Sequence, residues 1–296
     1  MKTVSLLTRR NVKLFFKDKG MFFTSMITPL ILLVLYATFL ANVYRDAFAS
    51  SLPAGILISD ELMNALVGGQ LFSSLLAVSC VTVAFCSNLL MVQDKVSGAR
   101  SDLDVTPVKR SAMAISYYLA SAICTLLICL VTVAAGCIYL SQIGWYLSFC
   151  DVLLILADVF LLVMFGTALS SIINYFLSSQ GQISAVGSIV SSCYGFICGA
   201  YMPISSFGEG LQMVLSFLPG TYGTALLRTH SLRGVLAELS DVGVPTAAID
   251  SLRDSVDCNV YFFDTRVSEP IMFTILGGTV ILLILAYILI NKIKKK

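Results

Sequence analysis

Long apolar runs set the strongest limit on how this chain can fold. Each run is long enough for an α-helix to cross about 30 Å of hydrocarbon at ~1.5 Å per residue. The six runs are 21–43, 66–91, 112–140, 150–176, 180–202 and 270–290. Composition agrees, because 57% of the residues are hydrophobic and 12% are charged, roughly half the charge of a soluble domain. The sequence predicts an all-α, polytopic membrane protein with one transmembrane domain over 1–296, and it excludes a soluble globule and a disordered chain.

The distribution of charge predicts the orientation of these spans. Residues 1–19, the loop 92–111 and the C-terminal tail together hold 14 of the 19 Lys and Arg but only four acids. The remainder holds five basic and thirteen acidic residues. Because cytoplasmic segments are rich in Lys and Arg, we expect both termini and the 92–111 loop in the cytoplasm, which requires an even number of spans. Six spans satisfy this requirement, and the net charge of +2 gives no reason to expect nucleic acid.

Residues 1–19 have the pattern of an amphipathic helix that lies on a membrane. One face is apolar and the opposite face is basic, which favours a position on the anionic cytoplasmic leaflet and makes membrane lipid an expected partner. The apolar face holds Val4, Leu7, Leu14 and Phe15, and the basic face holds Arg9, Arg10, Lys13 and Lys17. No small-residue cleavage site follows the first apolar run, so we expect a retained span.

The apolar stretch 181–227 is too long for one crossing, while two crossings would leave the Lys-rich tail outside. We therefore expect one span to about Met202, followed by an external re-entrant hairpin over 203–230. Pro203 and Pro219 would supply its breaks, because proline lacks the N–H that continues a helix. An interfacial loop on the outer leaflet is the alternative.

Residues 231–269 are predicted to form an external subdomain. Apolar residues recur at helical spacing on both sides of Pro245, and 260–263 is a candidate strand. The helical positions are Leu232, Val235, Leu236, Leu239, Ile249, Leu252 and Val256. The segment would cap an exit or bind a partner, or it would only pack over the hairpin.

Cysteine and histidine give no sign of a metal or cofactor. None of the nine cysteines forms C-x-x-C, and most lie in apolar runs, where free cysteine behaves as a small hydrophobe. Cys150 and Cys258 lie outside the predicted membrane, which leaves a disulfide between them open. His230 has no His or Cys at metal-ligand spacing. The sequence also lacks a phosphate-binding loop and a nucleophile elbow, so no catalytic residue is expected.

The loop 92–111 reads V-Q-D-K-V-S-G-A-R-S-D-L-D-V-T-P-V-K-R-S. Val92, Val96, Ala99 and Leu103 are spaced to share one face of a short helix, which Pro107 would end. Gly98 would permit close approach of a partner. An apolar face on a cytoplasmic loop needs a cover, either the membrane surface or a docked protein.

Three motifs follow one another along the chain. The first is Phe15-Phe16-Lys17-Asp18 ahead of Pro29, and the second is Gln93-Asp94-Lys95 through Gly98 to Thr106-Pro107-Val108-Lys109-Arg110. The third is Gly199-Ala200-Tyr201-Met202-Pro203-Ile204, then Leu218-Pro219-Gly220-Thr221-Tyr222, then Leu227-Arg228. Together they resemble the permeases of type-2 ATP-binding-cassette exporters. The chain differs in having Gln93 where Glu is common, and its external segment is longer than in polysaccharide exporters.

The resemblance implies the transmembrane permease subunit of an ATP-driven exporter in a plasma membrane of bacterial type. Its partners would be a cytoplasmic ATPase subunit, which uses the ATP and Mg²⁺, and a second permease copy or a related permease. The resemblance also makes the 92–111 loop the coupling helix. The implied coupling residues are Gln93, Asp94, Lys95, Val96, Gly98, Ala99, Arg100, Leu103, Thr106 and Pro107.

Polar residues within the spans are candidates for the translocation path. A carboxylate there costs ~2.5–3.5 kcal/mol on insertion scales. Asp158 is therefore either a contact in the path or a structural group that is protonated or bonded to a Ser or Tyr of a neighbouring span. The fifth span carries a stripe of small residues that either packs against a neighbouring helix or lines the path. The translocation and gating candidates are Asp158, Ser188, Ser192, Gly195, Gly199, Pro203, Pro219 and Arg228, with Ser73, Ser74, Thr82 and Asn88 as weaker ones.

Two other functions stay open. A polytopic enzyme that acts on lipid needs a clustered acid and base at the membrane. An ion-coupled carrier usually shows internal repeats and several intramembrane charges. The sequence shows one histidine and one clear intramembrane acid, which favours the exporter.

Overall fold

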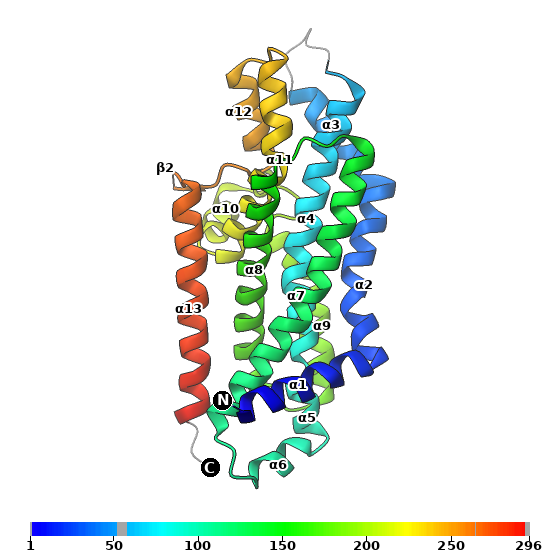
Figure 1. Cartoon of the computed structure of the whole chain (residues 1–296). Coiled ribbons are helices and arrows are strands. Elements are labelled where there is room, and N and C mark those ends of the chain that lie inside the picture. Colours follow the sequence, from blue (N-terminus) through cyan, green and yellow to red (C-terminus); the bar gives the residue numbers. More distant parts are fainter. Residues whose placement is uncertain (1, 52–57, 264, 294–296) are drawn as a thin grey trace.

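The computed structural model describes residues 2–51, 58–263 and 265–293, and these form an elongated bundle of helices (Figure 1). The elements in chain order are α1 Lys2–Lys17, α2 Lys19–Leu35, the π-helical η1 Tyr36–Leu40, α3 Ala41–Ser51, α4 Asp60–Asn88, α5 Leu90–Val96, α6 Ala99–Asp104, α7 Arg110–Ile143, α8 Phe149–Phe176, α9 Gln180–Ile197, the 3₁₀ turn η2 Ile204–Ser206, α10 Glu209–Ser216, α11 Pro219–Asp241, α12 Thr246–Ser255, β1 Tyr261–Phe262, β2 Thr265–Arg266 and α13 Glu269–Ile293. The all-α prediction is confirmed.

The two ends of the bundle carry different elements. The start of α1, the last turn of α13, α5 and α6 lie at one end, which we call the terminal end (Figure 1). The other end carries α3, the C-terminal half of α11 and α12, and we call it the α12 end.

Helix α4 is the centre of the bundle. It is apolar all round, the pattern of a helix enclosed on every side, and 89% of its most apolar stretch is buried. The corresponding values are 18% for the helix that begins with α2 and 17% for α13. Helices α2, α7, α8, α9 and α11 all contact α4.

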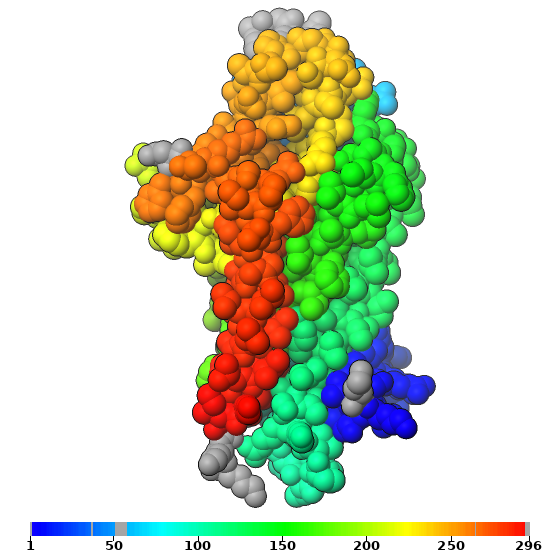
Figure 2. All heavy atoms as spheres, turned by 60° about the vertical axis from the view of Figure 1, so that its left-hand side comes forward, coloured from blue at the N-terminus to red at the C-terminus, as the bar shows by residue number. Residues whose placement is uncertain are grey.

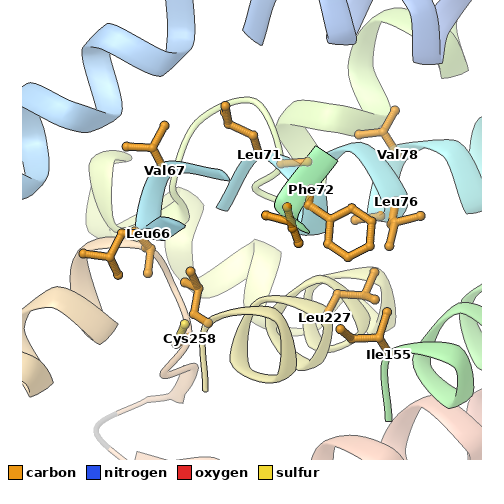
Figure 3. Packing of buried hydrophobic residues seen from close by; sticks show 14 of the residues in the cluster. Leu66, Val67, Leu71, Phe72, Leu76, Val78, Ile155, Leu227 and Cys258 are labelled. Atoms are coloured by element: carbon orange, nitrogen blue, oxygen red, sulfur yellow. The ribbon is translucent and has the colours of Figure 1, made fainter. Parts of the chain in front are cut away.

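The core around α4 is continuous from one neighbour to the next. Figure 3 shows Phe72 and Leu76 of α4 above Ile155 of α8 and Leu227 of α11, with Leu66 of α4 nearer to Cys258. On the outside, α13 forms a ridge along one face of the molecule, and α1 projects at its lower end (Figure 2).

Five helices of the described residues are long and apolar enough to cross a membrane: Lys19–Ser50, Asp60–Val96, Arg110–Ile143, Phe149–Phe176 and Glu269–Ile293. They contain the predicted spans 21–43, 66–91, 112–140, 150–176 and 270–290. The chain is therefore a multi-pass membrane protein. The remaining predicted span, 180–202, is the fifth in chain order and corresponds to α9. This 18-residue helix is not among the five. The count of six stays a prediction.

Helix α1 forms where the amphipathic pattern predicts it, but its buried face agrees with the predicted one only at Phe15. Thr8, Asn11 and Phe15 are buried, whereas Val4 and Leu7 are only partly covered. The helix packs against α7, so a protein contact has replaced part of the expected membrane contact.

The α12 end forms one core with the bundle. The helical apolar residues predicted between 231 and 256 are buried, together with Phe48 of α3 and Leu62 of α4. The predicted boundary at residue 230 lies inside α11, which runs unbroken from Pro219 to Asp241. The candidate strand at 260–263 contains β1, which pairs with β2 in an antiparallel register of Tyr261 with Arg266.

The α4–α8 contact depends on Gly166. A Cβ there would lie 2.9 Å from the Cα of Val81 and 3.1 Å from the carbonyl oxygen of Cys80. Gly166→Ala should therefore lower the apparent melting temperature in detergent by several degrees, because overpacking costs about 1–3 kcal/mol. Gly277→Ala is the matched control, since a Cβ at Gly277 has open space. Equal melting temperatures for the two variants would contradict this packing.

Candidate functional site

A groove of about 1110 Å³ runs along the bundle between α2 and α9. Cys86 of α4 and Leu89, which joins α4 to α5, also line the groove. Asp18, Gln93 and Gln180 line the groove at the terminal end, and Tyr201 and Met202 line it at the other. The groove thus extends over most of the length of α2.

The two walls of the groove differ in chemistry. The α2 wall presents large apolar side chains, such as Ile27, Ile31 and Leu35, beside the hydroxyls of Thr24 and Thr28. The α9 wall presents the hydroxyls of Ser184, Ser188, Ser191 and Ser192 beside Gly187, together with the apolar side chains of Ile183 and Phe196. An amphiphilic molecule would find a mainly apolar wall on α2 and a wall richer in hydroxyls on α9.

The small residues predicted to form a stripe along α9 have two different environments. Ser188 and Ser192 line the groove, where both are exposed. Gly195 and Gly199 are buried instead. The carbonyl of Gly195 accepts the N–H of Tyr201 at 3.0 Å, and this turn folds the Tyr201 ring back onto α9.

A buried ion pair holds the turn that follows α9. The Arg228 guanidinium, 1% exposed, lies 3.2 Å from Asp257 and also donates to the carbonyl of Gly199, which has a φ of +74°. The Asp257 carboxylate accepts the N–H groups of Ile204 at 2.5 Å and Ser205 at 3.1 Å. The chain is thus pinned on both sides of Pro203, and Asp257 is a residue that the sequence reasoning missed.

Pro203 and Pro219 lie where the sequence predicts breaks. Pro203 precedes η2, and Pro219 is the first residue of α11. Between them α10 forms a helix of eight residues.

The weaker polar candidates on α4 do not line the groove. Ser73, Ser74, Thr82 and Asn88 are buried, and Asn88 donates to the hydroxyls of Ser170 and Ser171 on α8. These side chains face neighbouring helices because α4 is enclosed on all sides.

The loop 92–111 contains two helices, so the prediction of one short helix with a continuous apolar face is wrong. Gly98, with a φ of +84°, ends α5 and begins α6. Only glycine readily adopts this conformation. Val92 is fully buried against Leu177 and Ile183, whereas Val96 is exposed.

Asp94 joins three helices at the terminal end. Its carboxylate accepts from the guanidinium of Arg10 on α1 at 2.7 Å and from the hydroxyl of Tyr117 on α7 at 2.5 Å. The bond to Asp94 is the largest cause of a raised pKa for Arg10. Arg10 and Tyr117 are 84 and 23 residues away along the chain, so no local pattern could have identified them.

Lys95 ties the same helix to α8. Its ammonium donates to the carbonyls of Asn174 at 3.2 Å, Tyr175 at 2.6 Å and Leu177 at 2.9 Å. The last carbonyls of a helix have no partner within the helix, and they attract a positive charge. Lys95 therefore caps α8, and α5 cannot move without pulling on that helix.

The far side of the loop is exposed. Val96, Val105, Thr106 and Pro107 are exposed, and Gln93, Ala99 and Leu103 are partly covered. Arg100 and Arg110 flank Asp104, each at 3.8 Å. Val105, 87% exposed, presents apolar surface at the tip of the molecule.

Asp158 is a buried group whose partner differs from the predicted one. Its Oδ2 lies 2.5 Å from Nδ1 of His230 on α11, not near a Ser or Tyr hydroxyl. The two residues are 72 positions apart, so no local pattern predicts that His230 reaches α8.

The cysteines are free, so the disulfide left open between Cys150 and Cys258 is absent. Cys150 is exposed and Cys258 is buried, where burial raises the thiol pKa to about 12. In the part of the chain that is described, no three His, Cys, Asp or Glu side chains gather as a metal site.

The α2–α9 groove, the loop 92–111 and the turn 199–205 all lie within residues 2–230. This range matches the family model of the ABC-2 type transporter. No curated protein matches the chain. The matched range covers well over half of the sequence and includes four of the five apolar helices. The chain therefore belongs to the ABC-2 type transporter family and is a membrane component of a transporter.

Proposed function

We propose that this chain is the permease subunit of an ATP-driven exporter, with the α2–α9 groove as its half of the translocation path. The α5–α6 loop would be the docking site for a separate ATPase. One observation carries the proposal: Gln93 belongs to the loop and also lines the groove. A displacement of the loop therefore changes the groove wall directly.

The groove favours a second permease copy as its cover. It is open along its length, and apolar side chains beside it are exposed, among them Phe39 of η1, Ile189 and Phe196 of α9. A two-fold pair of chains would set two such grooves face to face, because an isologous interface uses the same surface twice. The occupant of the closed space would be the cargo.

The proposed topology has six crossings, with α9 as the fifth. Helix α9 contacts α4, and a second copy would cover its polar residues. Helix α10 exposes Leu211, Met213, Val214 and Phe217, which suits a re-entrant hairpin held in the outer leaflet. The terminal end would face the cytoplasm, with the basic residues of α1 on anionic lipid.

Coupling would run through Asp94 and Lys95. Binding of ATP by the partner shifts the permease only if the partner contacts its two states differently. Because α5 is bonded to α1, α7 and α8, a push on the loop would move these helices together, as in rigid-body switching.

Val105 should contact the ATPase. A photo-crosslinking benzoylphenylalanine at Val105 should yield a crosslink to a protein of ATPase size in the native membrane, because Val105 is the most exposed apolar residue of the loop. The same residue at Val242, which is exposed at the α12 end, is the control. Crosslinks from Val105 to lipid alone would refute the docking site.

Ser188 should be reachable by water within the membrane. In a background where the cysteines that are not buried, Cys137, Cys150 and Cys193, are serine, Ser188→Cys should react with a charged thiol reagent. Leu282→Cys on α13 is exposed in the isolated chain but would face lipid, so it should stay unlabelled. Equal labelling of both positions would contradict an aqueous path beside α9.

Lys95→Met should uncouple the loop from α8. In the complex with its ATPase, ATP should change the labelling rate of Ser188→Cys. Lys95→Met should reduce this change about tenfold, which corresponds to ~1.4 kcal/mol of lost coupling. Lys109→Met, an exposed change in the same loop, should leave it intact. An unaltered response in Lys95→Met would show that the coupling takes another route.

A further inference from the structure

A cluster of ionisable residues lies away from the groove, where α8, α11 and α13 meet. Asp158 and His230 form its centre, with side chains 0% and 1% exposed and 2.5 Å between Oδ2 and Nδ1. Each has a second polar atom that is buried without a hydrogen-bond partner, namely Oδ1 of Asp158 and Nε2 of His230. The family match and the coupling loop assign this pair no role.

Glu269 connects this pair to the surface. It is the first residue of α13, its side chain is 44% exposed, and its Oε2 lies 3.6 Å from Nε2 of His230. The imidazole also stacks on the Phe273 ring at a centroid distance of 6.0 Å. The ring is thus held between a fully buried carboxylate and one that reaches the α12 end.

The charges around the ring do not balance when the imidazole is neutral. The acids are Asp158, Glu269 and Asp151, and the cation is Arg233, which lies 2.9 Å from Glu269 and 3.5 Å from Asp151. The Ser148 hydroxyl and N–H donate to Asp151. From α4, the Cys80 Sγ lies 3.9 Å from the carbonyl oxygen of Val159, the residue next to Asp158, and a thiol adds no positive charge.

Uncompensated negative charge in a buried site is costly, and a site of this kind takes up a proton to reduce it. The imidazole is the group that can accept this proton, since its Nδ1 is already committed to Asp158 and its Nε2 is open toward Glu269. A bound proton would leave Nδ1–H donating to Asp158 and Nε2–H pointing at Glu269.

We propose that Asp158 and His230 form a proton-binding site that is loaded from the α12 end through Glu269. The proton leaves bulk water for the Glu269 carboxylate and passes to Nε2. The proton on Nδ1 stays in the bond to Asp158. The gap of 3.6 Å exceeds a hydrogen bond, so the transfer requires Glu269 to rotate inward or one water molecule to bridge.

The bound proton would control how tightly α11 holds α8 and α13. With the proton, Asp158 and Glu269 both face a cation on α11. Without it, two carboxylates and a neutral ring are left, and Arg233 alone attracts Glu269. The site is separate from the α2–α9 groove, so the inference stands whether or not the export proposal is correct.

The single histidine makes a direct test available, because His230 is the only one in the sequence. The full chain, purified with a tag that contains no histidine, is labelled with ¹⁵N-histidine and placed in lipid nanodiscs. One imidazole is then followed by NMR between about pH 5 and 9, the range in which histidine titrates. We expect a hydrogen-bonded Nδ1–H throughout and gain of the Nε2 proton as the pH falls.

Asp158→Asn should lower the pH midpoint of this titration by about 1 unit or more, the size of shift that a bonded carboxylate produces. Glu269→Gln should lower it by less, because Glu269 lies further from the ring. Asp94→Asn is the matched control, since it removes another buried carboxylate at the terminal end, and it should leave the midpoint unchanged.

Two results would overturn the inference. One is an imidazole that titrates at the same pH in the parent chain and in Asp158→Asn. The other is a ring in the parent chain that stays neutral over the whole range, or whose Nδ1 carries no proton. The second result needs no variant, so it decides the matter even where Asp158→Asn does not fold.

Discussion

The enclosure of α4 is the constraint on which the rest of the structure depends. This helix is apolar on every side, and its burial requires neighbours all around it. Helices α7, α8 and α11 pack closely against it, with contacts as tight as that of Gly166 with the Val81 backbone. Between α2 and α9, which also contact α4, the groove reaches Cys86 of α4 and Leu89 just after it. The groove thus borders the C-terminal end of this central helix.

Charged hydrogen bonds hold the segments at the two ends of the bundle, beyond the apolar packing around α4. At the terminal end, Asp94 and Lys95 bind one loop helix to three others through charged hydrogen bonds. At the α12 end, Arg228 and Asp257 hold the turn after α9. Removal of a charge from water is costly, so buried pairs of this kind add specificity of position more than net stability. These pairs fix the positions of the α5 loop helix and of the turn after α9 on the bundle.

The two ends of the molecule accordingly suit different tasks. The loop of α5 and α6 combines an exposed apolar tip at Val105 with a Lys95 bond to α8 behind it, an arrangement that suits the proposed coupling role. The Asp158–His230 pair combines full burial with a half-exposed neighbour, Glu269, an arrangement that exchanges a proton with one side. The two arrangements lie apart, since the loop is at the terminal end (Figure 1), whereas the pair joins α8 and α11 beside the first residue of α13.

Local patterns in the sequence were sufficient to predict most of the long helices. Apolar runs of the right length identified five membrane helices, and helical spacing identified the buried faces of α11 and α12. These features depend on residues close together in the chain, because helical hydrogen bonds are local. The family motifs likewise lie in short stretches.

Only the tertiary structure could pair residues that are distant in the sequence. Asp94 with Arg10, Asp158 with His230, and Arg228 with Asp257 are joined across 84, 72 and 29 positions. The pattern of the loop also failed at Gly98, because a positive φ overrides apolar spacing. A charged side chain is recognised in a sequence by its type, but its partner depends on which helices pack side by side.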